Sequence, residues 1–330
     1  MSALILDEAQ VTEHLPMAEC IEAMAAVLAA RARGEASMPL RQIVRGPGAA
    51  GLLGLMPGYR GGEKRVYSLK AVCVFPGNPK LGLDAHQGIV ALFDGDTGRP
   101  TAILNGSAVT AIRTAAVTAL ATRVLARADA RSLAMIGSGV QARAHVESLL
   151  LVREFERVAI FSPTAANAER LASESRERFS GGPAFAVAHS AREALEGADV
   201  VVLATNSATP VIERSWVADG AHVNAIGSSV VSAHELDVAT LAASELFVDS
   251  RESVEHEAGE YRLARSEGLI GAGHVVAELG EVLIGERPGR SGDAALTVFR
   301  SLGIAVEDLA AAELALARAR AAGAGVEAQL

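Results

Sequence analysis

A short apolar run that breaks into a glycine-rich turn is the feature that most constrains the fold of this chain. Residues 133–136 read Leu-Ala-Met-Ile, and Gly137, Gly139 and Ala142 follow in the spacing G-x-G-x-x-A. In dinucleotide-binding domains the first glycine permits a tight strand-to-helix turn, the second lets backbone N–H groups approach a pyrophosphate, and the small third residue lets the helix pack closely. The pattern predicts a nicotinamide-type cofactor, with a glycine-rich structural turn as the alternative.

Further strand-like runs follow the turn. They occupy residues 133–136, 158–161, 184–188, 199–204, 221–226 and 245–249, with helical patterns between the earlier ones. Strands that alternate with helices predict an α/β fold with a doubly wound parallel sheet. Ligands of such sheets bind at the carboxyl ends of the strands.

The N-terminal part of the chain has a different texture. Residues 15–33 place apolar groups at helical spacing, and residues 40–104 contain short β-type runs separated by Pro-Gly and Asp-Gly turns, which predicts an antiparallel sheet. A long helix follows from near Thr110 to Arg127. The alanine-rich residues 305–322 predict a last helix that returns to this first domain or packs against another subunit.

Composition excludes some partners. The 39 acidic residues outnumber the 30 Lys and Arg residues without forming long blocks, which argues against nucleic acid and anionic membranes. Cys20 and Cys73 lie far apart, as buried reduced thiols would. Apolar runs are interrupted before the roughly 18 residues that a membrane span needs. The charged stretch 252–260 is interpreted as a solvated helix face, so no metal is predicted, and we expect a cytoplasmic protein.

Distinctive short motifs run through most of the chain, in addition to the turn from Gly137 to Ala142. They are Ser68-Leu-Lys-Ala71, Gly82-Leu-Asp-Ala-His-Gln-Gly88, Phe93-Asp-Gly-Asp-Thr-Gly98, Thr110-Ala-Ile-Arg-Thr-Ala-Ala116, Gly220-Ala-His-Val-Asn-Ala-Ile-Gly227, Glu278-Leu-Gly-Glu281 and Thr297-Val-Phe-Arg-Ser-Leu-Gly303. Together these motifs resemble the ornithine cyclodeaminase and mu-crystallin family. At key positions they are closest to its ketimine and pyrroline-carboxylate reductase branch.

The resemblance implies a homodimer with two domains. Residues 1–115 with 304–330 would form an α+β domain for substrate binding and dimerisation, and residues 116–303 a Rossmann domain that binds NAD(H) or NADP(H). Cofactor contacts are expected at Thr110, Gly137, Ser138, Gly139, Val140, Gln141, Ser162, Thr164, Thr205, Gly227 and Ser228. Family members act on the α-carbon of small amino or imino acids.

Two arginines are candidates for holding a substrate carboxylate, which a guanidinium binds bidentately. Arg113 lies in a motif where the family places such a contact, and Arg45 resembles the family's other arginine. The alternative for each is a surface arginine.

Lys70 is the candidate catalytic residue, because a lysine inside an apolar strand is uncommon and the family lysine aligns here. It would polarise the imine or donate a proton, and a snorkelling lysine is the alternative. His86 lies near the expected pocket and would contact substrate or nicotinamide.

Ser229 departs from the family pattern, since cyclodeaminases and alanine dehydrogenases carry aspartate there. A serine hydroxyl cannot take up a proton near neutral pH, which disfavours deamination and favours reduction of a preformed imine. Ser229 or Ser228 could instead cap the following turn.

The choice between NAD(H) and NADP(H) depends on the turn after residues 158–161. Ser162-Pro163-Thr164 offers neither the acid of NAD enzymes nor the arginine of NADP-using relatives. The two hydroxyls can bond a 2′-phosphate or a bare ribose, and we lean slightly to NADP(H).

The sequence thus predicts an NAD(P)H-dependent reductase of a small α-imino acid such as pyrroline-2-carboxylate or piperideine-2-carboxylate. The alternatives are a redox-neutral ornithine cyclodeaminase, an alanine or other amino-acid dehydrogenase, and a non-catalytic cofactor-binding protein of the crystallin kind.

Overall fold

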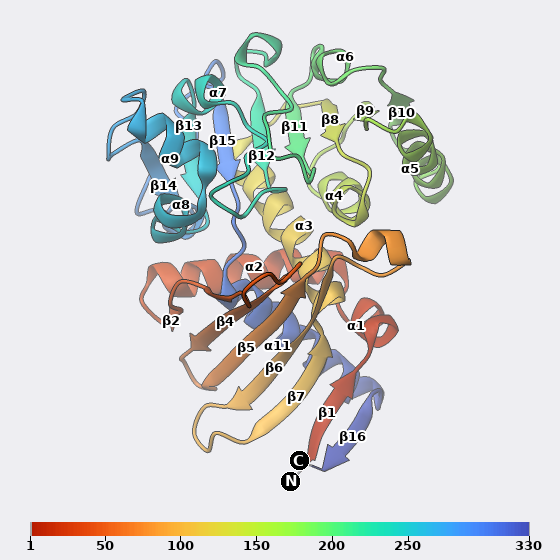
Figure 1. The fold of residues 1–330 in the computed structure, drawn as a ribbon, viewed down its shortest axis with the longest axis vertical. Coiled ribbons are helices and arrows are strands. Elements are labelled where there is room, and N and C mark those ends of the chain that lie inside the picture. The colour runs from red at the N-terminus through yellow and green to blue at the C-terminus, as the bar shows by residue number, and fades with distance from the viewer. Residues whose placement is uncertain (1, 330) are drawn as a thin grey trace. The chain divides into compact units, whose positions relative to one another are not determined.

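The computed structural model describes residues 2–329, and the chain divides into two compact units. The first unit is Met1–Ala116 with Ile304–Leu330, and the second is Val117–Gly303. The first division follows Ala116, one residue after the predicted boundary and inside helix α3 (Gly106–Leu125), and the second follows Gly303, as predicted. Each unit has its own sheet (Figure 1).

The first unit contains an eight-stranded sheet in the order β16-β1-β7-β6-β5-β4-β2, with β3 paired to β4. Besides the start of α3, its elements are β1 (Ser2–Leu6), α1 (Glu8–His14), α2 (Met17–Ala32), β2 (Ala36–Ser37), β3 (Gln42–Val44), β4 (Leu52–Arg60), β5 (Val66–Val74), the 3₁₀ turn η1 (Asn78–Leu81), β6 (His86–Asp94), β7 (Pro100–Asn105), α11 (Ala305–Ala322) and β16 (Val326–Gln329).

This sheet is larger than the antiparallel sheet predicted over residues 40–104. Strand β1 joins it parallel to β7, and β16 pairs antiparallel to β1. Both added strands come from the ends of the chain and are short, so they carry little periodicity of their own. Only pairing partners distant in sequence make them strands.

Helix α11 returns to the first unit. It packs against α2 and against strands β4, β5 and β6, and most of its alanines and leucines are buried. It ends at Gly323, whose φ of +66° is the left-handed cap that glycine adopts without strain. This settles one of the two alternatives for residues 305–322, since the helix covers the sheet of its own chain.

Helix α3 is long and apolar enough by composition to cross a membrane, contrary to the expectation that charge interrupts every such run. However, 72% of its most apolar 18-residue window is buried inside the protein. A core helix has this composition because it is surrounded by apolar side chains.

The second unit contains an eight-stranded sheet in the order β10-β9-β8-β11-β12-β15-β13-β14, in which every pair is parallel. After the end of α3, its elements are β8 (Ser132–Ile136), α4 (Val140–Leu150), β9 (Arg157–Phe161), α5 (Ala165–Arg178), β10 (Ala184–Val187), α6 (Ala191–Leu195), β11 (Val200–Leu203), the 3₁₀ turn η2 (Arg214–Trp216), β12 (His222–Ala225), α7 (Val238–Ala242), β13 (Glu245–Val248), α8 (Arg251–Glu257), α9 (Gly259–Ser266), β14 (Val275–Glu278), α10 (Leu279–Leu283) and β15 (Thr297–Arg300).

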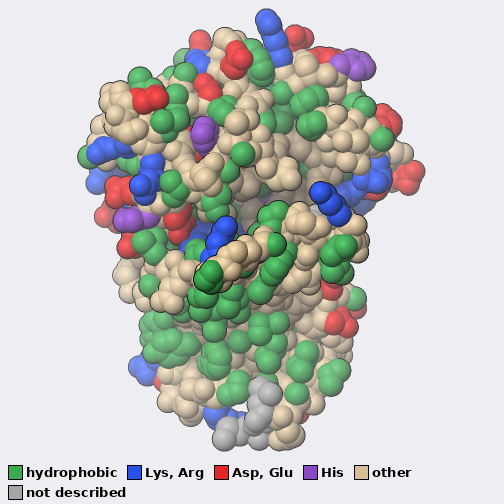
Figure 2. Space-filling view, viewed as in Figure 1, with side chains coloured by type: hydrophobic (Ala, Val, Ile, Leu, Met, Phe, Trp, Pro, Cys, Tyr) green, Lys and Arg blue, Asp and Glu red, His purple; other side chains and the backbone are tan. Residues whose placement is uncertain are grey.

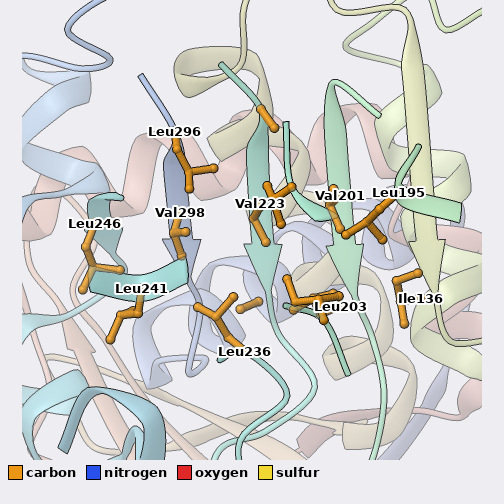
Figure 3. Close-up of a cluster of buried hydrophobic side chains, with 14 of the residues drawn as sticks. Ile136, Leu195, Val201, Leu203, Val223, Leu236, Leu241, Leu246, Leu296 and Val298 are labelled. Carbon is orange, nitrogen blue, oxygen red and sulfur yellow. The ribbon is translucent and has the colours of Figure 1, made fainter. Parts of the chain in front are cut away.

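The parallel sheet confirms the predicted fold class, and six of its strands are the predicted runs. Strands β14 and β15 were not predicted, and β15 lies between β12 and β13. Valines and leucines of β11, β12 and β15 pack into the core shown in Figure 3. The strand order reverses between β8 and β11, which is where such sheets open a crevice for a dinucleotide.

Candidate functional site

Lys70 lies on the buried face of β5, where only 4% of its surface is exposed. Its Nζ atom lies 2.7 Å from Oδ2 of Asp308, in the first turn of α11. An ammonium buried to this extent would be costly without such a partner. The snorkelling alternative for Lys70 therefore does not describe this side chain.

Arg113 joins the same group from helix α3. Its Nε donates to Oδ1 of Asp308 at 2.9 Å and its Nη1 donates to Oε2 of Glu307 at 2.9 Å. All four side chains are buried, Lys70 with Arg113 as cations and Glu307 with Asp308 as carboxylates. We call these four residues the buried ion cluster. Arg113 is thus not a surface arginine.

Close approach of α11 to the sheet places the two carboxylates. A Cβ atom on Gly58 would lie 3.3 Å from the carbonyl oxygen of Ala305 and 3.0 Å from Oγ of Ser68. The missing side chain of Gly58 lets the first turn of α11 lie directly on β4. Strand β5 pairs with β4, so Asp308 reaches Lys70 from that turn.

Burial and the neighbouring charges of the buried ion cluster shift the pKa values of Lys70 and Asp308. Burial lowers the pKa of Lys70 to about 8, against the opposing effect of Asp308, and the charges of Arg113 and Arg41 lower it further. The pKa of Asp308 is lowered because Arg113 and Lys70 outweigh the effect of its burial. At neutral pH Lys70 is therefore a protonated ammonium that gives up its proton more readily than an ordinary lysine.

Arg41, rather than Arg45, is the further arginine whose charge acts on Lys70. The two arginines flank β3 on either side, and Arg45 is exposed beyond its end. Sequence reasoning chose Arg45 and did not single out Arg41, because nothing local distinguishes the two ends of a three-residue strand. The role of Arg45 as a substrate contact stays a prediction. The charges that act on the ammonium of Lys70 thus include those of Arg41, Arg113 and Asp308.

His86 begins β6 and shares the Lys70 face of the sheet, since β6 pairs Val90 with Lys70 and His86 with Val74. Its side chain keeps solvent access, yet partial desolvation lowers its pKa and the charge of Lys70 lowers it further. His86 therefore belongs to the surroundings of Lys70 and stays a predicted substrate contact.

Glu307 and Asp308 were missed by sequence reasoning. Acidic residues in the first turn of a helix are common, because they complement the positive end of the helix dipole. Nothing in the sequence therefore marked them as partners of Lys70 and Arg113, which lie more than 190 residues away.

The phosphate turn of the second unit has the geometry its sequence predicts. Gly137 has φ of +121°, and a Cβ atom there would lie 2.3 Å from the carbonyl oxygen of Ala204. Gly139 precedes α4 without a side-chain cap, and a Cβ atom on it would meet nothing within 4 Å. The space beside Gly139 is thus open and no side chain of the N-cap residue accepts from the first amides of α4, which suits an anion site.

The neighbouring side chains also suit a dinucleotide. Ser138 donates to Ser162 at 3.0 Å, which joins the turn after β8 to the turn after β9. Among the described residues, the buried Oε1 atom of Gln141 has no hydrogen-bond partner. Val140 and Thr164 are exposed, and the Thr164 hydroxyl does not cap α5. The predicted cofactor residues of this region thus lie at the carboxyl ends of β8 and β9 with polar groups still available.

The remaining predicted cofactor residues follow β11 and β12. Thr205, Gly227 and Ser228 lie on adjacent loops, because β11 and β12 are neighbours. The Ser228 hydroxyl donates to the carbonyl oxygen of Ala233, so it closes its own loop, which is the capping alternative considered for it. Ser229 is exposed in the same loop. Thr110 belongs to the first unit, in the early part of α3.

Glu235 holds these two loops and was not predicted. Only 1% of its surface is exposed, and its carboxylate accepts from Thr205 and from the amides of Ile226 and Gly227. Burial raises its pKa to about 7, although these donors and the charge of Arg300 act in the opposite direction.

Arg300 holds the same turn from the other side. Its guanidinium donates to the carbonyl oxygens of Ala225 and Ser228 and forms a buried ion pair with Glu260. Glu260 therefore corrects the interpretation of residues 252–260 as a wholly solvated face, since only 1% of it is exposed. Among residues 2–329, no group of three or more His, Cys, Asp or Glu side chains is placed to hold a metal ion.

Comparison with known proteins identifies the family. The sequence model of the ornithine cyclodeaminase/mu-crystallin family matches residues 1–323. The chain belongs to this family. The resemblance proposed from the motifs is confirmed, and it extends over nearly the whole chain.

Relatives within the family include reductases of a cyclic imine. A Δ1-pyrroline-2-carboxylate reductase of Bacillus cereus is 40% identical over 258 residues, 78% of each chain. The structure of the Thermococcus litoralis Δ1-pyrroline-2-carboxylate reductase with NADH and L-proline is similar with a TM-score of 0.94 and 34% identity, over 98% of this chain and 99% of that one.

An archaeal alanine dehydrogenase is also similar. Its structure, described as a dimer with bound NAD, has a TM-score of 0.93 and 32% identity, and the match covers both chains completely. Similar proteins thus include both pyrroline-2-carboxylate reductases and an alanine dehydrogenase.

Proposed function

We propose that this protein is an NAD(P)H-dependent reductase of a small α-imino acid, with pyrroline-2-carboxylate or piperideine-2-carboxylate as the type of substrate. The observation that carries the proposal is the buried Lys70, whose pKa of about 8 leaves it protonated at neutral pH and able to donate that proton. The similarity to two pyrroline-2-carboxylate reductases supports the same reaction.

A bound NAD(P)H would supply a hydride to the imine carbon. Nζ of Lys70 would donate a proton to the imine nitrogen, which receives the electron pair of the C=N bond. Arg41 and Arg113 attract the substrate carboxylate, and Asp308 holds the ammonium in place. The products are the amino acid and the oxidised cofactor, so one hydride and one proton are accounted for.

Ser229 distinguishes this proposal from deamination. The residue is exposed in the loop after β12 and carries no acidic group that could take a proton from an attacking amine. We therefore expect ammonia release from ornithine to be absent.

The test is cofactor oxidation, followed by absorbance, with a panel of cyclic and linear α-imino acids. Oxidation with a cyclic imino acid supports the proposal. Ammonia release from ornithine without net change of cofactor would overturn it in favour of a cyclodeaminase.

For the cofactor we infer NAD(P)H with a lean to NADPH. The support is the turn after β9, where Ser162 and Thr164 offer hydroxyls and no carboxylate that would repel a 2′-phosphate. Both similar structures, however, contain NADH or NAD. Separate measurement of KM for NADH and NADPH tests the lean, and a lower KM for NADH would overturn it.

We further propose a homodimer formed through the face of the first sheet that lies opposite Lys70. On this face Val44, Tyr67 and Ile89 are 55%, 49% and 45% exposed, and apolar side chains occupy neighbouring positions. Figure 2 shows hydrophobic side chains spread over the region of these strands. An exposed apolar face of this kind marks an interaction surface, and a similar alanine dehydrogenase is described as a dimer.

Light scattering tests the dimer. Tyr67→Asp, which places a charge in the middle of this face, is expected to yield monomer, whereas Glu63→Lys at an exposed position before β5 should not. A monomeric wild-type protein would contradict the proposal.

A cytoplasmic location is part of the proposal. Both cysteines are free, and burial raises the pKa of the Cys20 thiol to about 12, so it stays unreactive. Unpaired thiols are usual in a reducing compartment. Localisation of a tagged protein in its host tests this, and secretion would contradict it.

A further inference from the structure

We propose that Glu235 is a positioning residue for the cofactor, whose buried carboxylate ties the loop after β11 to the turn after β12 so that both hold the nicotinamide half of the dinucleotide together. The inference rests on the proposed function only in requiring that the second unit binds NAD(P)H.

The first step is the geometry of the carboxylate. Its Oε2 atom accepts from the backbone N–H and the hydroxyl of Thr205, at 2.9 and 2.8 Å. Its Oε1 atom accepts from the amides of Ile226, at 3.2 Å, and Gly227. One side chain therefore satisfies four donors, and each oxygen serves a different loop.

The second step is how closely the loops approach each other. A Cβ atom on Gly227 would lie 2.1 Å from the carbonyl oxygen of Thr205 and 2.5 Å from Oε2 of Glu235. The turn after β12 thus lies directly against the loop after β11. Arg300 binds the other side of this turn through the carbonyl oxygens of Ala225 and Ser228. The turn is therefore held by one buried anion on its amides and one buried cation on its carbonyls.

The third step is where these loops lie along the sheet. The strand order is β9-β8-β11-β12, and the glycine-rich turn follows β8. In sheets of this kind the pyrophosphate would bind at that turn and the adenosine ribose after β9. The other half of a dinucleotide must then extend over the ends of β11 and β12, which are the loops that Glu235 joins. Loss of Glu235 should therefore weaken contacts to the nicotinamide half and leave the adenosine half unaffected.

The experiment compares two probes on one variant. Glu235→Gln keeps the size of the side chain, but its NH₂ group cannot accept from the amides of at least one loop. At pH 8, where a carboxyl group with a pKa of about 7 is mostly ionised, we expect the Kd of NADH to rise about tenfold, the effect of losing one or two charge-assisted hydrogen bonds. The Kd of ADP-ribose, which lacks the nicotinamide, should change by less than about twofold. If the wild type requires the 2′-phosphate, NADPH and 2′-phospho-ADP-ribose replace the two probes.

Asp199→Asn is the matched control. Asp199 directly precedes β11, at the amino-terminal ends of the parallel strands, whereas Glu235 lies at their carboxyl ends. Its carboxylate accepts from the amides of Arg131 and Ser132 and from the Ser132 hydroxyl. It joins the starts of two strands much as Glu235 joins the ends of two. We expect its replacement to lower the melting temperature while both Kd values change by less than about twofold.

The outcomes separate a positioning role from a structural one. Equal weakening of NADH and ADP-ribose, or no weakening of either, would overturn the proposal. If Glu235→Gln does not fold, hydrogen exchange of the wild type replaces it. NADH but not ADP-ribose should then slow exchange at Thr205, Ile226 and Gly227 together, and independent behaviour of the two loops would overturn the proposal.

These readouts do not depend on turnover. A wild type that binds NADH but reduces no imino acid defeats the proposed function and leaves this proposal in place. A wild type that binds neither NADH nor NADPH defeats both.

Discussion

The two units bury charge in opposite ways. In the first unit, Lys70 and Arg113 face the carboxylates of Glu307 and Asp308, so charge is paired with charge. In the second unit, Glu235 and Arg300 form most of their hydrogen bonds with backbone amides and carbonyls. Paired side chains shift each other's pKa values, and a proton can be exchanged among them. Charges bonded to the backbone fix the shape of a loop instead.

This difference leads us to expect different roles for the buried charges of the two units. The buried ion cluster is suited to proton transfer at the substrate, and the Glu235 and Arg300 contacts are suited to holding the cofactor loops. Variants of the first unit should therefore change catalysis and its pH dependence, whereas variants at Glu235 should change cofactor affinity. The following predictions test that contrast, beginning with the largest effect.

Lys70→Ala should reduce kcat for imine reduction by about 10²- to 10⁴-fold, the usual contribution of a general acid. Asp308 keeps its contact with Arg113, so the fold should survive. The Kd of NADH should stay within about twofold, since Lys70 lies in the other unit. Cofactor oxidation and fluorescence titration measure the two quantities.

Lys64→Ala, at an exposed lysine before β5, serves as the control for Lys70→Ala and should change neither value. Wild-type turnover by Lys70→Ala would refute the assignment of Lys70 as the proton donor. A large loss of NADH affinity in Lys70→Ala would break the contrast between the two units.

The pH profile of the reductase should follow Lys70. Because burial lowers its pKa from 10.5 to about 8, kcat/KM for imine reduction should fall as pH rises through about 8, where the ammonium loses its proton. Asp308 raises this pKa, so Asp308→Asn should move the fall to lower pH and cost about tenfold in kcat/KM at pH 8. A pH series of initial rates measures both.

Glu313→Gln is the control for Asp308→Asn. Glu313 lies on the same helix but pairs with Arg60, near the protein surface. Its replacement should leave the pH profile in place. If kcat/KM of Asp308→Asn falls at the same pH as that of the wild type, Asp308 only supports the fold and does not set the pKa of Lys70.

The lowered pKa of Lys70 also makes the folding stability depend on pH. The folded state releases the Lys70 proton near pH 8, whereas the unfolded state holds it until about 10.5. The unfolded state thus binds more protons between these values, so the contribution of Lys70 to stability rises with pH in this window. Lys70→Ala should remove that rise, which unfolding by urea at pH 8 and pH 10 can measure.

Arg41→Lys should raise the KM for the imino acid by about tenfold and change kcat less, because a lysine cannot hold a carboxylate bidentately. Arg45→Lys, at the exposed arginine beyond β3, should change KM by less than about twofold. The reverse pattern would restore Arg45 as the carboxylate contact. Initial rates over a range of imino acid concentrations decide between them.

Much of the fold was predictable from local sequence. The phosphate turn, six strands of the parallel sheet and the helices over 140–150, 165–178 and 305–322 have strong periodicity and clear end signals. The motifs also led to the correct family. They singled out Lys70, whose catalytic role stays a prediction. Strands β1, β14, β15 and β16 were missed. They lie near the chain ends or after the last run that the sequence marked, and pairing with strands elsewhere in the sheets makes them strands.

The site was less predictable than the fold. Glu235, Glu260 and Asp308 appear in the sequence as ordinary acidic residues on loops or helices. Their burial, and thus their contacts, depends on partners outside their own helix or loop, such as Thr205 for Glu235, Arg300 for Glu260 and Lys70 for Asp308. The choice between Arg41 and Arg45 likewise depends on which end of β3 lies near Lys70.

By itself, the sequence determined that a dinucleotide turn, a parallel sheet and a lysine-bearing strand are present, because backbone geometry and hydrophobic periodicity act over a few residues. The tertiary structure alone decided which charges meet. A buried carboxylate shifts a lysine's pKa or holds a loop only when folding brings it within hydrogen-bond distance and removes water. That is why Asp308 affects the acidity of Lys70, whereas Glu235 binds backbone amides.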